Sequence, residues 1–383
     1  LMREYINSIL LENGLEKVRH RLTRLGTPPF EARKLFESDL IPLNLITSFG
    51  SDVSEQFLLL NLLPNDLADL YLSGDICLLN LNYWALKPLS IYVTPNLDID
   101  IKQGSTYYDL MKQIFQNLSF LRMLKYYISE DMVIGNFNIN YLSILHSLKP
   151  KKYRNFLELL ILNFFCPYDK SSSQINPFTL QFNFTASENS KQYEENRLNK
   201  DLEFYTMINK WKIKHPNLKP PLLLTDQSIF NKTTSNQDLV EKLSLLKAIN
   251  DNMVYYNSQK SHIINASINR MGNSNSKNNP NRNQLLLDKI LINLHSIALK
   301  AKQNDDLFFD LLENRLNSVF EFFSIKTKLI NNRLKKIHEW NSLISRLNFE
   351  NSFKMIKESL KSISFFGLSE SIKTHCDIEL ERV

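Results

Sequence analysis

Histidine, cysteine and aspartate side chains are the residues of this chain most able to bind a metal or act as a nucleophile. The histidines are scattered, with no H-E-x-x-H pattern and no paired ligand spacing. The tripeptide His375-Cys376-Asp377 contains three catalytic residue types in a row. Neighbours on a helix point about 100° apart, so these three cannot act on one another. We therefore expect no catalytic residue, no metal site and no cofactor.

Phosphate-binding loops need closely spaced glycines, and this sequence lacks them. It has 8 glycines in 383 residues, and the closest two, Gly14 and Gly26, are twelve positions apart. Neither G-x-G-x-x-G nor G-x-x-x-x-G-K-[ST] can be written. Asp98 and Asp100 lie on one face of an expected strand and could form a carboxylate pair, but a solvated strand face is the favoured explanation. The sequence favours a protein that is not an enzyme.

The charge is mildly basic, with 46 basic and 40 acidic residues and a net charge of +6. A dedicated nucleic-acid binder usually has a larger excess, so nucleic acid is disfavoured as a partner without being excluded. Two basic groups could contact phosphates or lipid head groups, but the favoured explanation is that they are cations at a helix end and on a solvated helix face. These candidate residues are Lys212, Lys214, Lys219, Arg333, Lys335 and Lys336.

Three widely spaced cysteines give no disulfide framework, which indicates a reducing compartment. The most apolar runs, 57–63 and 156–166, are far shorter than the roughly 18–20 residues of a membrane span. We expect a cytoplasmic protein, either soluble or peripheral on a membrane, with the nucleus as the alternative location.

Hydrophobic periodicity divides the chain into four parts: an N-terminal helical unit (1–84), a small α+β module (85–168), a linker with one candidate strand (169–192) and a helical bundle (193–383) with a polar loop at 272–283. Within the bundle, helices are expected at 202–214, 237–271, 284–302, 353–366 and 371–380. The predicted fold class is therefore mostly α, a bundle with long C-terminal helices and a small embedded α+β module.

The α+β module has a recognisable order of elements. Strands are expected at 88–93 and 97–101, a turn at Gly104-Ser-Thr, a helix at 107–120, and strands at 131–134, 137–141 and 156–164. This order resembles the ubiquitin-like β-grasp fold of FERM first lobes and Ras-association domains. The resemblance implies a GTPase contact along the second strand, but Asp98 and Asp100 there favour another kind of protein partner. The alternative is that 156–164 is a buried helix segment and that the whole region is helical.

The most regular pattern begins after the helix cap Asn304-Asp305-Asp306. Apolar residues recur every three or four positions, which predicts about 40 residues of continuous helix, about 60 Å long. A wide aromatic stripe of this kind is a candidate partner surface. Its candidate partner-binding residues are Phe308, Leu312, Leu316, Phe320, Phe323, Ile330, Leu334, Ile337 and Trp340.

These patterns together predict a non-enzymatic adaptor or scaffold subunit of a cytoplasmic assembly, in membrane traffic or in cargo or organelle attachment, that binds other protein subunits. Two alternatives remain open. One is a subunit of a nuclear chromosome-associated complex of the kinetochore or replication type. The other is a peripheral helical module that binds an anionic membrane surface through its basic residues.

Overall fold

The computed structural model describes residues 42–94, 107–142, 150–164, 166–167, 178–182, 191–216, 218–226, 253–256, 263–264, 270–271, 283–347 and 351–378. Several predicted features lie outside these ranges. They are the N-terminal helix before residue 42, the strand 97–101 with Asp98 and Asp100, the turn at Gly104, and all but the last residue of the loop 272–283.

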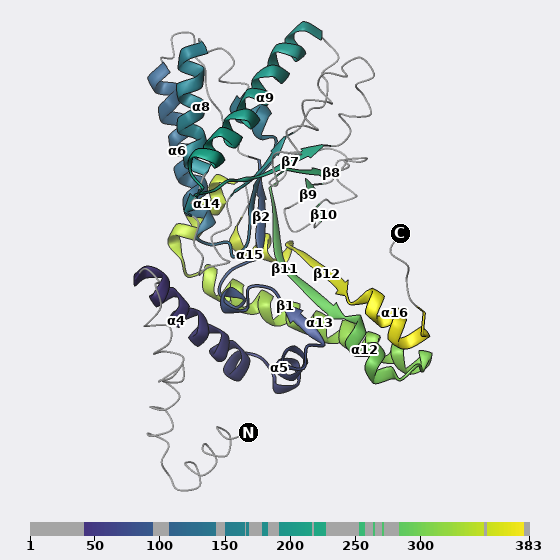
Figure 1. The fold of residues 1–383 in the computed structure, drawn as a ribbon. Coiled ribbons are helices and arrows are strands. Elements are labelled where there is room, and N and C mark those ends of the chain that lie inside the picture. The colour runs from purple at the N-terminus through teal and green to yellow at the C-terminus, as the bar shows by residue number, and fades with distance from the viewer. Residues whose placement is uncertain are drawn as a thin grey trace.

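A mixed sheet of eight strands forms the centre of the molecule (Figure 1), in the order β1-β11-β2-β3-β5-β7-β8, with β12 paired to β11. Strands β2, β3, β5, β7 and β8 are parallel, whereas β11 is antiparallel to β2 and parallel to β12. The bounds are β1 Ile76–Leu78, β2 Ser90–Val93, β3 Met132–Ile134, β5 Thr179–Phe182, β7 Leu222–Asp226, β8 Met253–Tyr256, β11 Gln284–Asn293 and β12 Leu360–Phe366.

Three helices connect the parallel strands in turn and gather on one side of the sheet (Figure 1): α6 (Tyr107–Lys125), α8 (Pro150–Phe164) and α9 (Lys191–Lys214). Successive strand-helix-strand units are the usual way to build a parallel sheet, because parallel neighbours need a long crossover. The buried faces of these helices and of the sheet share one apolar core, in which Phe137 contacts Phe164, Phe182 and Phe204.

The C-terminal part returns to the sheet after β11. Helix α13 packs against β1 and β11 in a second apolar core that includes Ile290, Val319 and Phe322. Figure 1 shows β12 and α16 beside α12, away from α6, α8 and α9. The helices of this part are α12 Leu294–Ala301, α13 Asp305–Leu334, α14 His338–Arg346, α15 Ser352–Lys357 and α16 Leu368–Cys376.

The remaining elements complete the described chain. They are α4 Pro42–Phe57, the π-helical η1 Leu58–Leu62, α5 Asn65–Leu72, the 3-10 helix η2 Leu81–Tyr83, the π-helical η3 Asn138–Leu142, and two small pairs, β4 Cys166–Pro167 with β6 Leu218–Lys219 and β9 Ile263–Ile264 with β10 Arg270–Met271.

The predicted fold class is wrong, because the molecule is built on a sheet and not on a helical bundle. Residues 284–293 were expected to be helical but form β11, and the segment 237–271 contains β8, β9 and β10. In β11 the residues Leu285, Leu286 and Leu287 are all buried, so both faces are covered. A strand buried on both faces has no alternation, and its apolar run resembles a helix segment.

The β-grasp resemblance is also wrong. Strand β2 and helix α6 lie where they were expected, and β3 agrees with the strand at 131–134. However, residues 138–142 form a π-helix and residues 150–164 form α8, so 156–164 is helical, as the alternative held. In this segment Phe156, Leu160 and Phe164 are buried while Leu159 and Leu162 are exposed, which is a helical and not a strand period. The other part of that alternative is wrong, because the region also contains the strands β2 and β3.

The long C-terminal helix is shorter than predicted. Helix α13 has 30 residues and ends at Leu334, and a break at residues 335–337 separates it from α14. The stripe of aromatic and aliphatic residues turns mostly toward the chain's own core. Phe323, Ile330, Leu334 and Trp340 are buried, Phe308, Leu312, Leu316 and Ile337 are half-buried against the two cores, and Phe320 is exposed.

Candidate functional site

The carboxyl ends of the parallel strands form one edge of the sheet. Strands β2 and β3 pair through Val93 and Ile134, and β5 and β7 pair through Phe182 and Thr225, so these strands end side by side. In open α/β sheets, ligands bind at the carboxyl ends of the strands. This edge is therefore the first place to look for a binding site.

A buried polar pair lies just below this edge. The Tyr92 hydroxyl of β2 donates a hydrogen bond to Oε1 of Gln181 of β5, at 2.8 Å. Burial raises the pKa of Tyr92 to about 12, and the Thr94 hydroxyl beside it opposes this shift only in part. Tyr92 is consequently a neutral phenol at physiological pH, and it joins two strands that are separated by β3.

Gly135 explains how a tyrosine fits at this position. A Cβ atom at Gly135 would lie 2.0 Å from the Tyr92 hydroxyl oxygen, a distance that no real side chain tolerates. The Gly135 N–H also donates to the Val93 carbonyl at 2.8 Å, which extends the β2–β3 pairing by one residue. Gly135 therefore allows the phenol ring to lie directly over the end of β3.

Asn283 connects this edge to the C-terminal part of the chain. The Thr94 N–H donates to Oδ1 of Asn283 at 2.8 Å, and Nδ2 of Asn283 donates to the Leu347 carbonyl at 2.9 Å. The side-chain amide of Asn283 thus hydrogen-bonds both the backbone N–H just after β2 and the backbone carbonyl of the residue that follows α14. The edge is therefore fixed both within the sheet, by Tyr92 and Gln181, and from the C-terminal part of the chain, by Asn283. A binding site that must keep its geometry needs such support.

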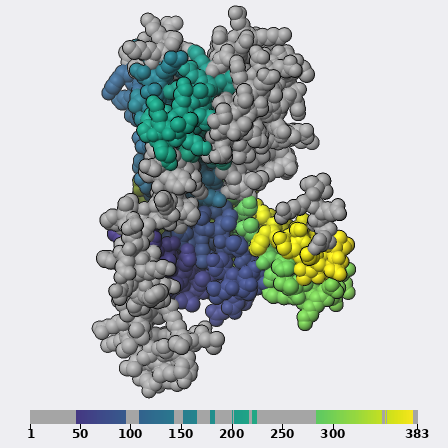
Figure 2. Space-filling view, viewed as in Figure 1, coloured from purple at the N-terminus to yellow at the C-terminus, as the bar shows by residue number. Residues whose placement is uncertain are grey.

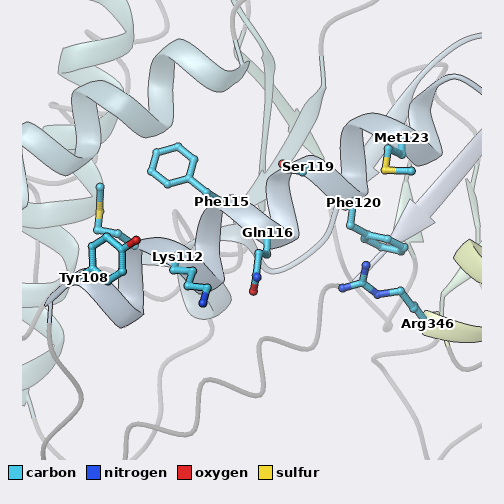
Figure 3. A pocket seen from close by; sticks show the side chains of 9 residues that line it. Tyr108, Lys112, Phe115, Gln116, Ser119, Phe120, Met123 and Arg346 are labelled. Atoms are coloured by element: carbon cyan, nitrogen blue, oxygen red, sulfur yellow. The ribbon is translucent and has the colours of Figure 1, made fainter.

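A groove of about 820 Å³ follows the outer side of α6 (Figure 3). Figure 3 shows the Arg346 guanidinium next to the Phe120 ring, and its central carbon lies 4.6 Å from the ring centroid. Lys112 supplies a second cation from α6. A groove of aromatic and amide side chains with two cations suits an aromatic anion. Its lining residues are Tyr108, Met111, Lys112, Phe115, Gln116, Ser119, Phe120, Met123 and Arg346.

A buried ion pair lies between the sheet and α13. Nζ of Lys326 lies 2.9 Å from Oδ1 of Asp288, and both side chains are fully buried. Trp84 Nε1 donates to Oδ2 of Asp288 at 2.7 Å. Burial raises the pKa of the Asp288 carboxyl and lowers the pKa of the Lys326 ammonium, while their attraction opposes both shifts. Because Trp84 and Lys326 satisfy this carboxylate, we interpret the pair as a structural connection between β11 and α13.

The sequence-based site residues do not converge on these places. Arg333, Lys335 and Lys336 are exposed around the end of α13, whereas Lys212 and Lys214 end α9, and Lys219 belongs to β6. Tyr92, Gln181 and the Asp288–Lys326 pair were not predicted from the sequence. An aspartate inside the apolar run Gln284–Asn293 was the one visible signal for the last of these.

The described ranges hold neither a metal-binding cluster nor a helix suited to span a bilayer. There, no group of three or more histidine, cysteine, aspartate or glutamate side chains is placed to hold a metal ion. Among the helices that the structure describes, none combines the length and the apolar character that a bilayer crossing requires.

The fold has clear relatives among solved structures. The anaerobic ribonucleotide reductase from Thermotoga maritima, with citrate in its active site, matches with a TM-score of 0.63 and 12% identity, over 97% of this chain and 73% of that one. The same enzyme in complex with dATP and CTP matches with a TM-score of 0.57 and 12% identity, over 86% and 60%. A further anaerobic ribonucleotide reductase matches with a TM-score of 0.62 and 13% identity, over 89% and 60%.

This chain thus spans between 60% and 73% of the length of these three structures. No curated protein sequence matches it significantly. A family model, anaerobic ribonucleoside-triphosphate reductase, matches residues 116–382, which is more than half of the chain.

These matches contradict the prediction of a non-enzymatic adaptor in membrane traffic, together with its alternatives, because the matching family is one of enzymes. The absence of glycine-rich loops and of a local catalytic motif misled that prediction. The absence of such motifs excludes only sites that are contiguous in the sequence. The parallel sheet instead brings together residues from distant segments of the chain. On the family match, we conclude that this chain belongs to the anaerobic ribonucleoside-triphosphate reductase family.

Proposed function

We propose that this chain works as the nucleotide-binding part of an anaerobic ribonucleotide reductase, with the substrate over the carboxyl edge of β2, β3 and β5. Family membership supports the reaction class. The observation that carries the location is the arrangement of Tyr92, Gln181 and Gly135 at the ends of adjacent parallel strands. Carboxyl ends of parallel strands are where such sheets bind their ligands.

Ribonucleotide reduction requires both a site that binds the nucleotide and a source of electrons, and the two need not be the same residues. Converting a ribonucleotide to a deoxyribonucleotide replaces a C–OH bond by a C–H bond, consumes two electrons and two protons, and releases water. The two cysteines whose side chains the structure describes, Cys77 and Cys376, lie on β1 and α16 and not on the strands of this edge. Burial also raises the pKa of the Cys77 thiol, which disfavours the reactive thiolate. We assign binding and orientation to the edge, and the electrons to a donor outside the described residues.

The groove on α6 is a second candidate nucleotide position. A solved relative forms a complex with both dATP and CTP, so nucleotides of two kinds are relevant to this fold. In the groove, the partly exposed Phe115 ring offers apolar contact for a base. Lys112 and Arg346, whose guanidinium lies over the buried Phe120 ring, offer charge for phosphates. We propose that dATP, or a deoxynucleotide like it, binds there.

Calorimetric titration of the full chain with CTP tests the first position. We expect saturable binding, and we expect Gly135→Ala to weaken it at least tenfold, because the new methyl displaces Tyr92 from the edge. A tenfold change corresponds to about 1.4 kcal/mol. Gly50→Ala is the matched control, since a Cβ atom there meets no other atom within 4 Å. Failure of the folded chain to bind CTP, or unchanged binding by Gly135→Ala, would contradict the proposal.

Titration with dATP tests the groove. Arg346→Gln removes the cation beside Phe120 and is expected to weaken dATP about tenfold while leaving CTP unchanged. Arg333→Gln is the control, because Arg333 is exposed and does not line the groove. If both variants bind dATP equally, the nucleotide does not use this groove.

A further inference from the structure

One face of strand β12 is only partly covered by the rest of the chain. Alternate side chains of a strand share a face, so Lys361, Ile363 and Phe365 lie together on one side of β12. Ile363 is half-buried against the apolar core that α13 forms with the sheet, whereas Lys361 is exposed and Phe365 is 51% exposed. Figures 1 and 2 show β12 and α16 (yellow) at the surface of the molecule. The helical layer on the α13 side of the sheet therefore leaves part of β12 uncovered.

A groove of about 380 Å³ lies between this face of β12 and helix α13. Phe320, Ser324 and Lys328 line it from α13, and their spacing of four residues places them in one row along the helix. The Phe320 ring is 60% exposed, and Lys328 is also exposed. Lys361 and Ile363 line the groove from β12. Each wall thus carries an apolar side chain and a cation, and none of the described lining residues is acidic.

The two walls favour a helix as the occupant. A sheet buries its apolar face against a further layer, and in this molecule helices form that layer. In an amphipathic helix the apolar residues form one stripe, and the residues on both sides of the stripe point toward the two walls of a groove. An apolar stripe can therefore pack on Phe320 and Ile363. Acidic residues that flank the stripe on either side meet Lys328 of α13 and Lys361 of β12.

The charge of the groove also favours a different protein over a second copy of this chain. Two copies related by a twofold axis would bring the same patch together, so Lys328 and Lys361 would face the same cations. Like charges placed opposite one another oppose association. The partner must therefore supply the negative charge.

We propose that the groove between α13 and β12 binds an amphipathic helix of a partner protein, with apolar side chains in one stripe and glutamate or aspartate on both sides of it. The helix lies beside α13 and covers the exposed face of β12. None of the described residues that line this groove belongs to the sheet edge or to the groove on α6, so the interaction goes beyond the proposed nucleotide binding.

A fluorescein-labelled peptide of three heptads, titrated with the full chain and followed by fluorescence anisotropy, tests the proposal. The peptide carries leucine at the a and d positions, glutamate at the flanking e and g positions, and alanine or glutamine elsewhere. We expect saturable binding that weakens at higher salt. The double variant Lys328→Glu/Lys361→Glu is expected to weaken it at least tenfold, and Phe320→Ala at least threefold. All three side chains are exposed, so both variants are expected to fold.

Matched controls separate this groove from general stickiness. Phe57→Ala removes a comparably exposed ring, 53% against 60%, from α4, outside the groove. Lys210→Glu/Lys214→Glu makes the same change in net charge at exposed positions of α9. Neither variant is expected to alter the affinity for the peptide.

Three kinds of outcome would overturn the proposed helix site. One is that the peptide does not bind, or that a peptide with lysine in place of glutamate binds as well. Another is equal binding of a peptide with the same composition in scrambled order, which would show that no helical stripe is recognised. The third is a self-associated form of the chain that Phe320→Ala abolishes, which would assign the groove to a contact between two copies.

Discussion

The two halves of the sheet pack against their helices through different kinds of interaction. On the parallel half, α6, α8 and α9 are held by apolar packing rich in aromatic rings, with the Phe137 centroid 5.3 to 5.6 Å from those of Phe164, Phe182 and Phe204. On the C-terminal half, α13 is fastened to β11 partly by charge, through the fully buried Lys326–Asp288 pair.

This difference predicts how the stability of each half responds to substitutions. An aromatic layer loses stability in proportion to the contacts removed, because many small contributions add up. A buried ion pair behaves as a unit, because removal of one partner leaves the other charge buried without compensation. We therefore expect single substitutions to be most destructive at the ion pair.

The largest effect is expected from Lys326→Met. The substitution keeps an apolar stem but leaves the Asp288 carboxylate without its cation, which should cost about 3–5 kcal/mol of unfolding free energy. Lys328→Met is the matched control, because Lys328 is exposed on the same helix, and it should stay within about 0.5 kcal/mol of the parent chain. Urea denaturation of both variants measures the difference.

Adding Asp288→Leu to Lys326→Met sharpens this comparison. The double variant has no buried charge left, so we expect it to recover part of the lost stability, although the Trp84 N–H loses its acceptor. A Lys326→Met variant that loses less than about 1 kcal/mol would show that the carboxylate is protonated or hydrated in the folded chain.

A smaller effect is expected from Gly135→Ala on the parallel half. The added methyl would clash with the Tyr92 ring, and overpacking of this kind costs about 1–3 kcal/mol. Gly50→Ala makes the same chemical change inside α4 where space is open, and should stabilise the chain by about 0.5–1 kcal/mol. Thermal or urea unfolding of the two variants measures the expected loss of stability at Gly135 and the expected gain at Gly50. Equal changes in the two variants would refute a clash with Tyr92.

The sequence predicted individual elements of the parallel half better than their assembly. Alternation in Phe178–Phe184 indicated β5, and helical spacing indicated α6 and the C-terminal part of α9. It could not show that β2, β3 and β5 pair in parallel, because that pairing depends on helices crossing between them. The same loss of local signal hid Tyr92 and Gln181, which are 89 residues apart and meet only in the sheet.

On the C-terminal half the sequence was misleading where burial is most complete. Strand β11 is covered on both faces, so its apolar run lacks the alternation of a half-buried strand. The stripe on α13 was correctly placed on a helix, but periodicity cannot distinguish a core-facing stripe from a partner-facing one. Phe320 and Phe323 show this, because three positions separate an exposed ring from a buried one.

The smallest effect is expected from Tyr92→Phe, and pH makes it specific. At neutral pH the variant loses one buried hydrogen bond to Gln181, which should cost about 1 kcal/mol. The pKa of Tyr92 is raised from 10.0 to about 12, so the folded state binds this proton more tightly than the unfolded state. Its stabilisation is complete below pH 10 and is lost as the pH rises toward 12.

Urea unfolding of the parent and Tyr92→Phe at pH 8 and at pH 11 separates the two contributions. Other alkaline titrations are common to both proteins, so the difference between the two chains isolates Tyr92. We expect the parent to lose its advantage at pH 11, because ionisation of the phenol would place a charge inside the sheet. An advantage that stays constant between the two pH values would mean that the hydroxyl is in contact with water, and the edge of the parallel half would then be open instead of packed around this pair.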